Sequence, residues 1–235
     1  MDEYTRNSFE LGQNGKVEGF HRSIWEWEAS INNEIQPSVD DRRIIPFDFS
    51  GPSVYRAPNS IESRIHHHLT PYTIQPIGGF VAVIPYGRLW GPTGSVLSTE
   101  GKLIHDLSPE YDEKLNRMMT PEEHPALSRR SDQDQQHVPG TVAALTFCGI
   151  HNYFHWLYDV LPRFYMLQCT GCSCHSLIMN PNPYRFFVEE TLTMLGISEP
   201  TVMRTHNHFN IQADRVIMPS FMMNSHYPAG PLRFS

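Results

Sequence analysis

The spacing of apolar and polar residues along the chain differs before and after about Gly140. Beyond this point, short apolar blocks alternate with longer amphipathic ones, a pattern typical of strands that alternate with helices. The blocks predict strands at 141–147, 176–179, 201–204 and 214–218 and helices at 152–168 and 184–195. The run at 141–147 is apolar throughout, as expected of a strand covered on both faces. Residues 140–235 therefore predict an α/β fold with a parallel, Rossmann-like sheet.

The part of the chain before Gly140 has a different pattern, in which short β-prone blocks are separated by glycine and proline. Residues 43–107 predict a small β-rich section that includes a strand at 80–84. Two blocks at 95–98 and 102–105 predict a hairpin in which Gly101 takes a positive φ. Residues 108–139 are polar and interrupted by proline, and they predict a linker or loop.

The N-terminal part of the chain is acidic. Residues 1–50 carry a net charge of −5 out of −7 for the whole chain. Apart from one amphipathic stretch at 23–35 that could form a helix, this part lacks sustained apolar periodicity. Residues 1–42 are therefore expected to be a partly ordered lead-in and not a folding unit of their own.

Composition narrows the class of protein. The 235 residues have room for one large domain or two small ones, and 40% are hydrophobic, which is enough for a core. A net negative charge argues against a nucleic-acid partner. No apolar run reaches the ~18–20 residues that a transmembrane helix needs, although peripheral membrane contact stays open.

The start of the chain is polar, without the features of a secretory signal. Three of the four cysteines crowd together at Cys169, Cys172 and Cys174, unlike the spread cysteines of a disulfide scaffold. Reduced thiols and a cytoplasmic location are therefore expected.

The most informative segment leads from the apolar strand into the next helix. Asn152 is a favourable N-cap. His155, Asp159 and Arg163 then follow at intervals of four, so they share one helix face. This face is expected at the carboxyl edge of the sheet, where α/β proteins bind ligands.

A histidine and an aspartate one turn apart can form a hydrogen bond, and the carboxylate then fixes the tautomer of the imidazole. Such a pair suits a general base that removes a proton from a hydroxyl group. We expect His155 and Asp159 to point together into an open, sugar-sized cleft. The alternative is an ion pair between Asp159 and Arg163, with His155 in a structural position at the helix start.

Residues 152–163 read NYFHWLYDVLPR. This segment resembles the N-Y-[FY]-H-W-L-x-D-x-L-P-R motif of glycosyltransferase family 61. Residues 97–106, 187–197 and 213–220 resemble, in the same order, a hairpin, a helix and a strand of that family. The resemblance covers roughly residues 80–235 and is greatest to the bacterial capsular-polysaccharide-biosynthesis branch.

This resemblance implies the N-terminal half of a GT-B glycosyltransferase, with the chain stopping where the second half is expected. It also implies inverting transfer of a sugar from a nucleotide-sugar donor to a saccharide hydroxyl, without a metal or other cofactor. In that reaction His155 or Asp159 is the base and the other orients it. Asn152 and Arg163 are candidate substrate-binding residues.

Two alternatives stay open. The chain could be an inactive fragment that binds a saccharide or a partner chain. It could also be a metal-dependent hydrolase that uses His151, His155 and the cysteine cluster at 169–174, although closed zinc sites draw on separated ligand pairs and no metal ligand is predicted. The sequence does not indicate an oligomeric state.

Overall fold

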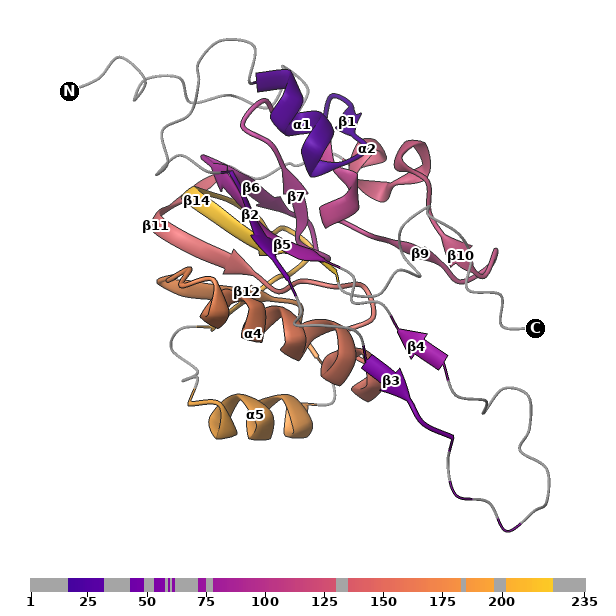
Figure 1. Cartoon of the computed structure of the whole chain (residues 1–235). Helices are drawn as coiled ribbons and strands as arrows, with labels where there is room; N and C mark the ends of the chain where they lie inside the picture. Colours follow the sequence, from indigo (N-terminus) through magenta and orange to yellow (C-terminus); the bar gives the residue numbers. More distant parts are fainter. Residues whose placement is uncertain are drawn as a thin grey trace.

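The fold is built around one mixed sheet of ten strands (Figure 1). The computed structural model describes residues 17–31, 43–48, 53–57, 59, 61, 72–74, 78–129, 135–182, 185–196 and 202–221. The strands of the large sheet are β1 (Phe20–His21), β2 (Ile44–Phe47), β5 (Gly79–Pro85), β6 (Arg88–Trp90), β7 (Ser95–Leu97), β8 (Leu103–Ile104), β11 (Gln136–Ala144), β12 (Ser176–Met179), β13 (Val202–Arg204) and β14 (Asn210–Pro219). Two separate pairs are β3 (Ser53–Tyr55) with β4 (Tyr72–Ile74), and β9 (Tyr111–Asp112) with β10 (Arg117–Met118).

The helices are short. They are α1 (Ile24–Ile31), α2 (Pro125–Ser128), α3 (Tyr153–His155), α4 (Leu161–Cys169) and α5 (Arg185–Met194), with 3-10 turns η4 (His105–Leu107) and η5 (Pro121–Glu123) and a π-helical turn η6 (Trp156–Val160). None of the helices in the described ranges has both the length and the apolar composition to cross a membrane.

Four parallel strands form the α/β part of the sheet, in the order β14-β11-β12-β13. Helices α3 and α4 connect β11 to β12, and α5 connects β12 to β13. The predicted alternation of strands and helices, and with it the α/β class, is confirmed. Strands β11 and β14 start earlier than predicted, because a bulge at Gly140, whose φ is +86°, lets polar residues 136–138 continue the pairing.

Strand β14 connects the β-rich section with the α/β section, which the sequence pattern predicts as separate parts of the chain. One of its sides pairs with β11, and the other pairs antiparallel with β5 and β6. Strands β2, β5, β6, β7 and β8 of section 43–107 therefore belong to one sheet with the strands of section 140–235. The predicted hairpin is present, with Leu97 opposite Leu103 and Gly101 at φ +75°.

Helices cover both faces of this sheet (Figure 1). Alternate residues of a strand point to opposite faces, and two neighbours in β5 show which helix lies on which side. A Cβ on Gly79 would meet the Met166 side chain of α4, whereas Phe80 packs edge-to-face against Trp25 of α1 at 5.7 Å between ring centroids. The sheet is thus held between α1 and α4, which explains why its central strands are apolar on both sides.

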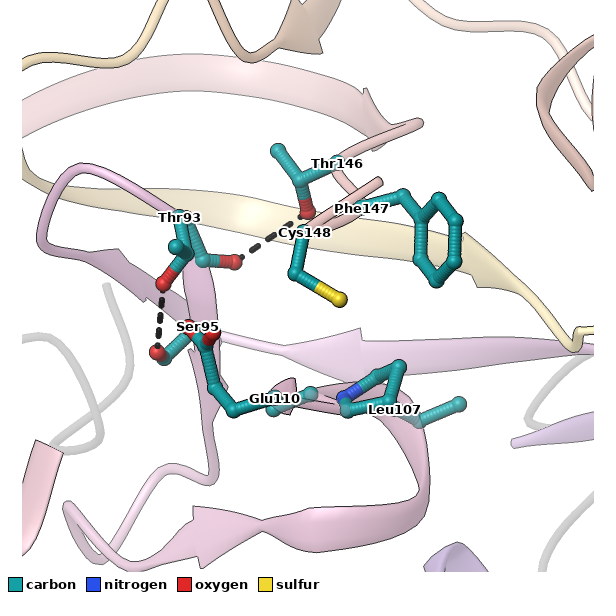
Figure 2. Close-up of a pocket in the computed structure, with 10 residues that line it drawn as sticks. Thr93, Ser95, Leu107, Glu110, Thr146, Phe147 and Cys148 are labelled. Atoms are coloured by element: carbon teal, nitrogen blue, oxygen red, sulfur yellow. Dashed lines mark hydrogen bonds between the residues drawn. The ribbon is translucent and has the colours of Figure 1, made fainter. Parts of the chain in front are cut away.

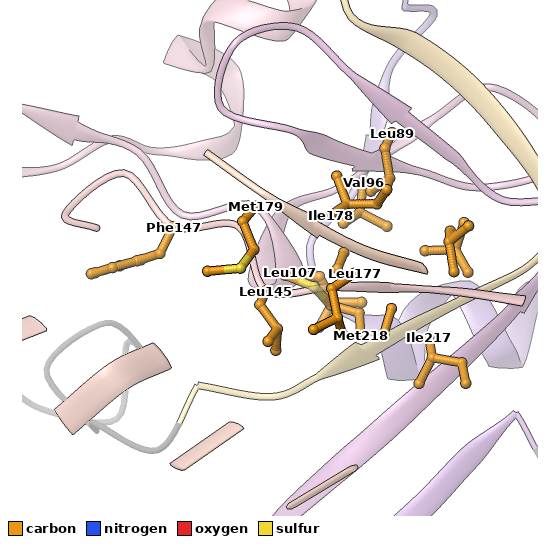
Figure 3. Close-up of a cluster of buried hydrophobic side chains, with 14 of the residues drawn as sticks. Leu89, Val96, Leu107, Leu145, Phe147, Leu177, Ile178, Met179, Ile217 and Met218 are labelled. Carbon is orange, nitrogen blue, oxygen red and sulfur yellow. The ribbon is translucent and has the colours of Figure 1, made fainter. Parts of the chain in front are cut away.

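The largest hydrophobic cluster follows the central strands and the helices that cover them. Figure 3 shows part of it, with side chains from the β-rich and the α/β sections packed together. Its fully buried members include Leu89, Val96, Ile178 and Met218. Burial of a side chain of this kind stabilises a fold by about 1.5–3 kcal/mol, so the two sections stabilise each other.

Residues 108–129 are more ordered than the linker expected at 108–139. The imidazole of His124 is buried, donates from Nε2 to the Ser108 carbonyl at 2.9 Å and accepts from the Ala126 N–H at 3.1 Å. Burial lowers the pKa of His124 to about 4. These bonds replace the apolar periodicity that the sequence lacks here, and they hold α2 against the rest of the fold.

Residues 17–31 of the acidic lead-in also pack on the sheet. Helix α1 lies within the predicted stretch 23–35, and Ile24 and Trp27 are buried. Its first turn is held by a distant residue, because both carboxylate oxygens of Asp106 lie 3.0 Å from the N–H of Ile24. Burial raises the pKa of Asp106 to about 7, although hydrogen bonds from backbone N–H groups oppose the rise.

Replacing Asp106 by asparagine is expected to change how stability depends on pH. The carboxyl binds its proton more tightly in the folded chain than at its ordinary pKa of 3.8, so it destabilises the fold as pH rises from about 4 to about 7. As the pH rises from 5 to 8, the free energy of unfolding of Asp106→Asn should increase by on the order of 2 kcal/mol relative to that of the wild type. Urea unfolding at each pH measures this difference. Buried His124 changes the pH dependence of the free energy of unfolding in the opposite direction, but it is present in both proteins, so its effect cancels in the comparison. Parallel pH profiles for the two proteins would contradict this prediction.

Candidate active site

The segment between β11 and α4 holds the residues that the sequence singled out. Strand β11 ends at Ala144, and the chain turns through residues 145–152 before α3 begins. Asn152 is the N-cap, as predicted, since its Oδ1 accepts from the N–H of Phe154 at 2.8 Å. Trp156 is fully buried and its indole N–H donates to Thr191 of α5 at 2.9 Å, which fixes the helix against its neighbour.

His155 and Asp159 form the expected hydrogen bond. The distance between Nδ1 of the imidazole and Oδ2 of the carboxylate is 2.7 Å. Because a carboxylate only accepts, Nδ1 carries the proton and the lone pair of the neutral ring lies on Nε2. The His155 side chain is 31% exposed. The imidazole is therefore anchored on one nitrogen and accessible to a ligand.

Asp159 is not open to a ligand, contrary to the expectation that both groups point into a cleft. Its side chain is completely buried, and its Oδ1 lacks a hydrogen-bond partner within the described part of the chain. A carboxylate oxygen in that position costs stability. Asp159 lies in η6 together with buried Trp156 and Val160, and its burial leaves it to orient the imidazole of His155.

Close packing fixes the imidazole from other directions. The ring of Phe147 lies edge-on to His155 at 5.3 Å, and the ring of Phe154 lies at 5.6 Å. A Cβ on Gly149 would come within 2.9 Å of Cδ2 of His155 and 2.7 Å of Cε1 of Phe147. Only glycine fits at position 149 without displacing these rings.

Arg163 does not reach the surface, and this corrects its assignment as a substrate-binding residue. It is fully buried. Its guanidinium donates to the carbonyls of Ala144, Thr146 and Pro219 at 2.9–3.0 Å. These carbonyls follow or end β11 and β14, so Arg163 joins the carboxyl ends of two strands. It also does not form the alternative ion pair with Asp159, which pairs with His155 instead.

A small polar pocket lies on the other side of the same turn (Figure 2). Its cavity volume is about 10 Å³. The residues that line it come from the β-rich section, from the start of the segment that follows it and from the turn after β11: Thr93, Gly94, Ser95, Leu107, Ser108, Pro109, Glu110, Thr146, Phe147 and Cys148. Phe147 belongs both to this pocket and to the packing around His155, so the two features are adjacent.

Two titratable groups in this pocket have shifted pKa values. Burial raises the pKa of Glu110, although a hydrogen bond with Thr93 and the charge of Arg129 oppose the rise. Burial also raises the pKa of the Cys148 thiol to about 12, and the charges of Glu110 and Asp159 raise it further. Cys148 is thus a protonated thiol at neutral pH and is no nucleophile.

The residues of the hydrolase alternative are not brought together. His151 precedes the N-cap, whereas the imidazole of His155 pairs with Asp159. Cys169, Cys172 and Cys174 have free thiols. Over the described ranges, no three His, Cys, Asp or Glu side chains are grouped so that they could hold a metal ion.

Sequence reasoning missed Phe147, Gly149 and Glu110 as parts of the site. The sequence does indicate a role for Gly149, since a glycine between a buried strand and a helix permits close approach to a neighbouring group. The sequence gives no indication of a role for Glu110, because this residue lies in a polar stretch whose folding depends on contacts far along the chain.

Comparisons with protein-family models, with curated proteins and with solved structures find no match to this chain.

Proposed function

We propose that this protein transfers a sugar from a nucleotide-sugar donor to a hydroxyl group of a saccharide, with His155 as the general base. The observation that carries the proposal is the hydrogen bond between Nδ1 of His155 and Oδ2 of buried Asp159, at 2.7 Å, on an imidazole that is 31% exposed. A general base must be held in one tautomer and must also be reachable, and His155 meets both requirements.

The chemical step uses Nε2. In the proposed reaction Nε2 accepts the proton of the acceptor hydroxyl while the oxygen attacks the anomeric carbon of the donor. The bond between that carbon and the diphosphate oxygen breaks, and the nucleoside diphosphate leaves with the bonding electrons. Asp159 stabilises the imidazolium that forms, because its carboxylate remains next to Nδ1–H.

The position of the pair supports this reading. The turn that leads to His155 follows the carboxyl end of β11, and α/β proteins place ligand sites at that edge of the sheet. Asn152 begins the same helix and is exposed, so it stays a candidate ligand contact. The resemblance of residues 152–163 to a glycosyltransferase family 61 motif favours sugar transfer over other reactions of hydroxyl groups.

The finer features belong to the same proposal. They are a GT-B arrangement in which this chain supplies the first, Rossmann-like half, inversion at the anomeric carbon, independence from metal ions, a role in bacterial polysaccharide biosynthesis and a cytoplasmic location. A nucleotide sugar and a saccharide acceptor are the partners.

A donor screen tests the proposal. The protein is incubated with UDP-, GDP- and TDP-sugars and with oligosaccharide acceptors, with and without EDTA, and the released nucleotide and the glycosylated product are measured by mass spectrometry. We expect one donor class to be consumed at the same rate in EDTA, with inverted anomeric configuration in the product by NMR. Nucleotide release no faster than that of His155→Ala for every donor would refute the proposal.

A further inference from the structure

The polar pocket beside His155 has the size of a single functional group. Its cavity of about 10 Å³ is close to what one water-sized group needs. It lies between residues 93–95, which lead into β7, and the turn that carries Cys148 (Figure 2). A whole sugar ring does not fit, but a single hydroxyl does.

The polar groups around this space suit a neutral hydroxyl. The hydroxyl oxygens of Thr93 and Ser95 lie 3.4 Å apart, and either can donate or accept. Glu110 is only 9% exposed, and its carboxylate is a strong acceptor. The hydroxyl of Thr146 is already committed to the carbonyl of Gly94 at 3.2 Å. A phosphate would meet the carboxylate of Glu110 with a like charge and is too large for the cavity.

The pocket and the imidazole share one turn of the chain. Phe147 lines the pocket and also lies edge-on to His155 at 5.3 Å. The next residue, Cys148, faces the pocket, and its thiol experiences the charges of both Glu110 and Asp159. The pocket and the imidazole are therefore neighbours that share Phe147 as a common wall.

We propose that Glu110 and Thr93 form a subsite that accepts one non-reacting hydroxyl of the acceptor saccharide and so selects which acceptor is positioned at His155. This inference rests on the proposed function, because it assigns a second contact to the same substrate. Glu110 is then a specificity residue, and the carboxylate accepts the hydrogen bond of that hydroxyl.

Acceptor kinetics test the subsite. Glu110→Gln keeps the size of the side chain but removes the charge, and Glu113→Gln, at an exposed position nearby, is the matched control. We expect Glu110→Gln to raise the KM for the acceptor about tenfold, the effect of losing one hydrogen bond to a charged group, with kcat changed less than about threefold. One monodeoxy acceptor should show the same tenfold loss in the wild type and no additional loss in Glu110→Gln.

Binding of the acceptor supplies a readout that does not depend on turnover. Isothermal titration calorimetry of the acceptor, without donor, should give a Kd about tenfold higher for Glu110→Gln than for the wild type and an unchanged Kd for Glu113→Gln.

The outcomes separate the subsite from the proposed function. If the wild type transfers sugar but Glu110→Gln has an unchanged KM and an unchanged Kd for the acceptor, the pocket holds a structural water only and the subsite is refuted. If the wild type transfers sugar from no donor to any acceptor, the proposed function fails and the subsite fails with it.

Discussion

Replacing His155 by alanine is expected to slow sugar transfer by at least about 100-fold while the protein stays folded, because general base catalysis contributes on the order of 10²–10⁴ to a rate. The imidazole is partly exposed, so its removal leaves little unfilled space in the core, but buried Asp159 loses the hydrogen bond to Oδ2, which lowers the free energy of unfolding. The KM for the donor should change little, since the imidazole acts on the acceptor hydroxyl. Initial rates at saturating donor and acceptor, with circular dichroism to verify folding, measure the effect.

His151→Ala is the matched control, since this exposed histidine lies on the same segment but before the helix. Asp159→Asn should also reduce kcat strongly, because an uncharged partner stabilises the imidazolium less. It should leave binding of the acceptor almost unchanged, because Asp159 is fully buried. Equal rates for wild type, His155→Ala and His151→Ala would remove His155 from the mechanism.

Replacing Arg163 by methionine is expected to lower the free energy of unfolding by about 3–5 kcal/mol, since three buried carbonyls lose a charged donor. Methionine fills much of the space but offers no N–H group. The guanidinium also lies 4.3 Å from the ring centroid of Phe221, so a cation–π contact is lost as well. Equilibrium unfolding in urea measures the change.

Arg215→Met is the control, because Arg215 is an exposed arginine on the same strand, β14, as Pro219. It should change stability by less than about 0.5 kcal/mol. Arg163→Lys should be nearly as destabilising as Arg163→Met, because a single ammonium cannot match the planar fork of a guanidinium. Similar unfolding midpoints for Arg163→Met and Arg215→Met would show that the carbonyls find other partners.

The α/β part of the fold could be predicted because its signal is local. An apolar run such as 141–147 and the amphipathic repeat that follows it depend on residues a few positions apart. The same holds for the cap at Asn152 and for the hydrogen bond between His155 and Asp159. All of these features are present in the structure.

The features that could not be predicted depend on contacts between residues that are far apart in the sequence. Nothing near Asp106 indicates that it holds α1, because its partner Ile24 lies 82 residues away. Helical spacing places Arg163 on the same face as Asp159, but only the ends of β11 and β14 show that its guanidinium is committed to backbone carbonyls. Glu110 likewise became a candidate once Thr93 and Cys148 were found around it.

The position of β14 has a consequence for biosynthesis. This strand pairs with β5, β6 and β11, so the sheet cannot close until residues 210–219 have been synthesised. Until then, the nascent chain presents the unpaired edges of β5 and β11, which are prone to pair with other polypeptides. Assembly of the sheet therefore waits for residues 210–219, and pairings of such long sequence separation make it slow.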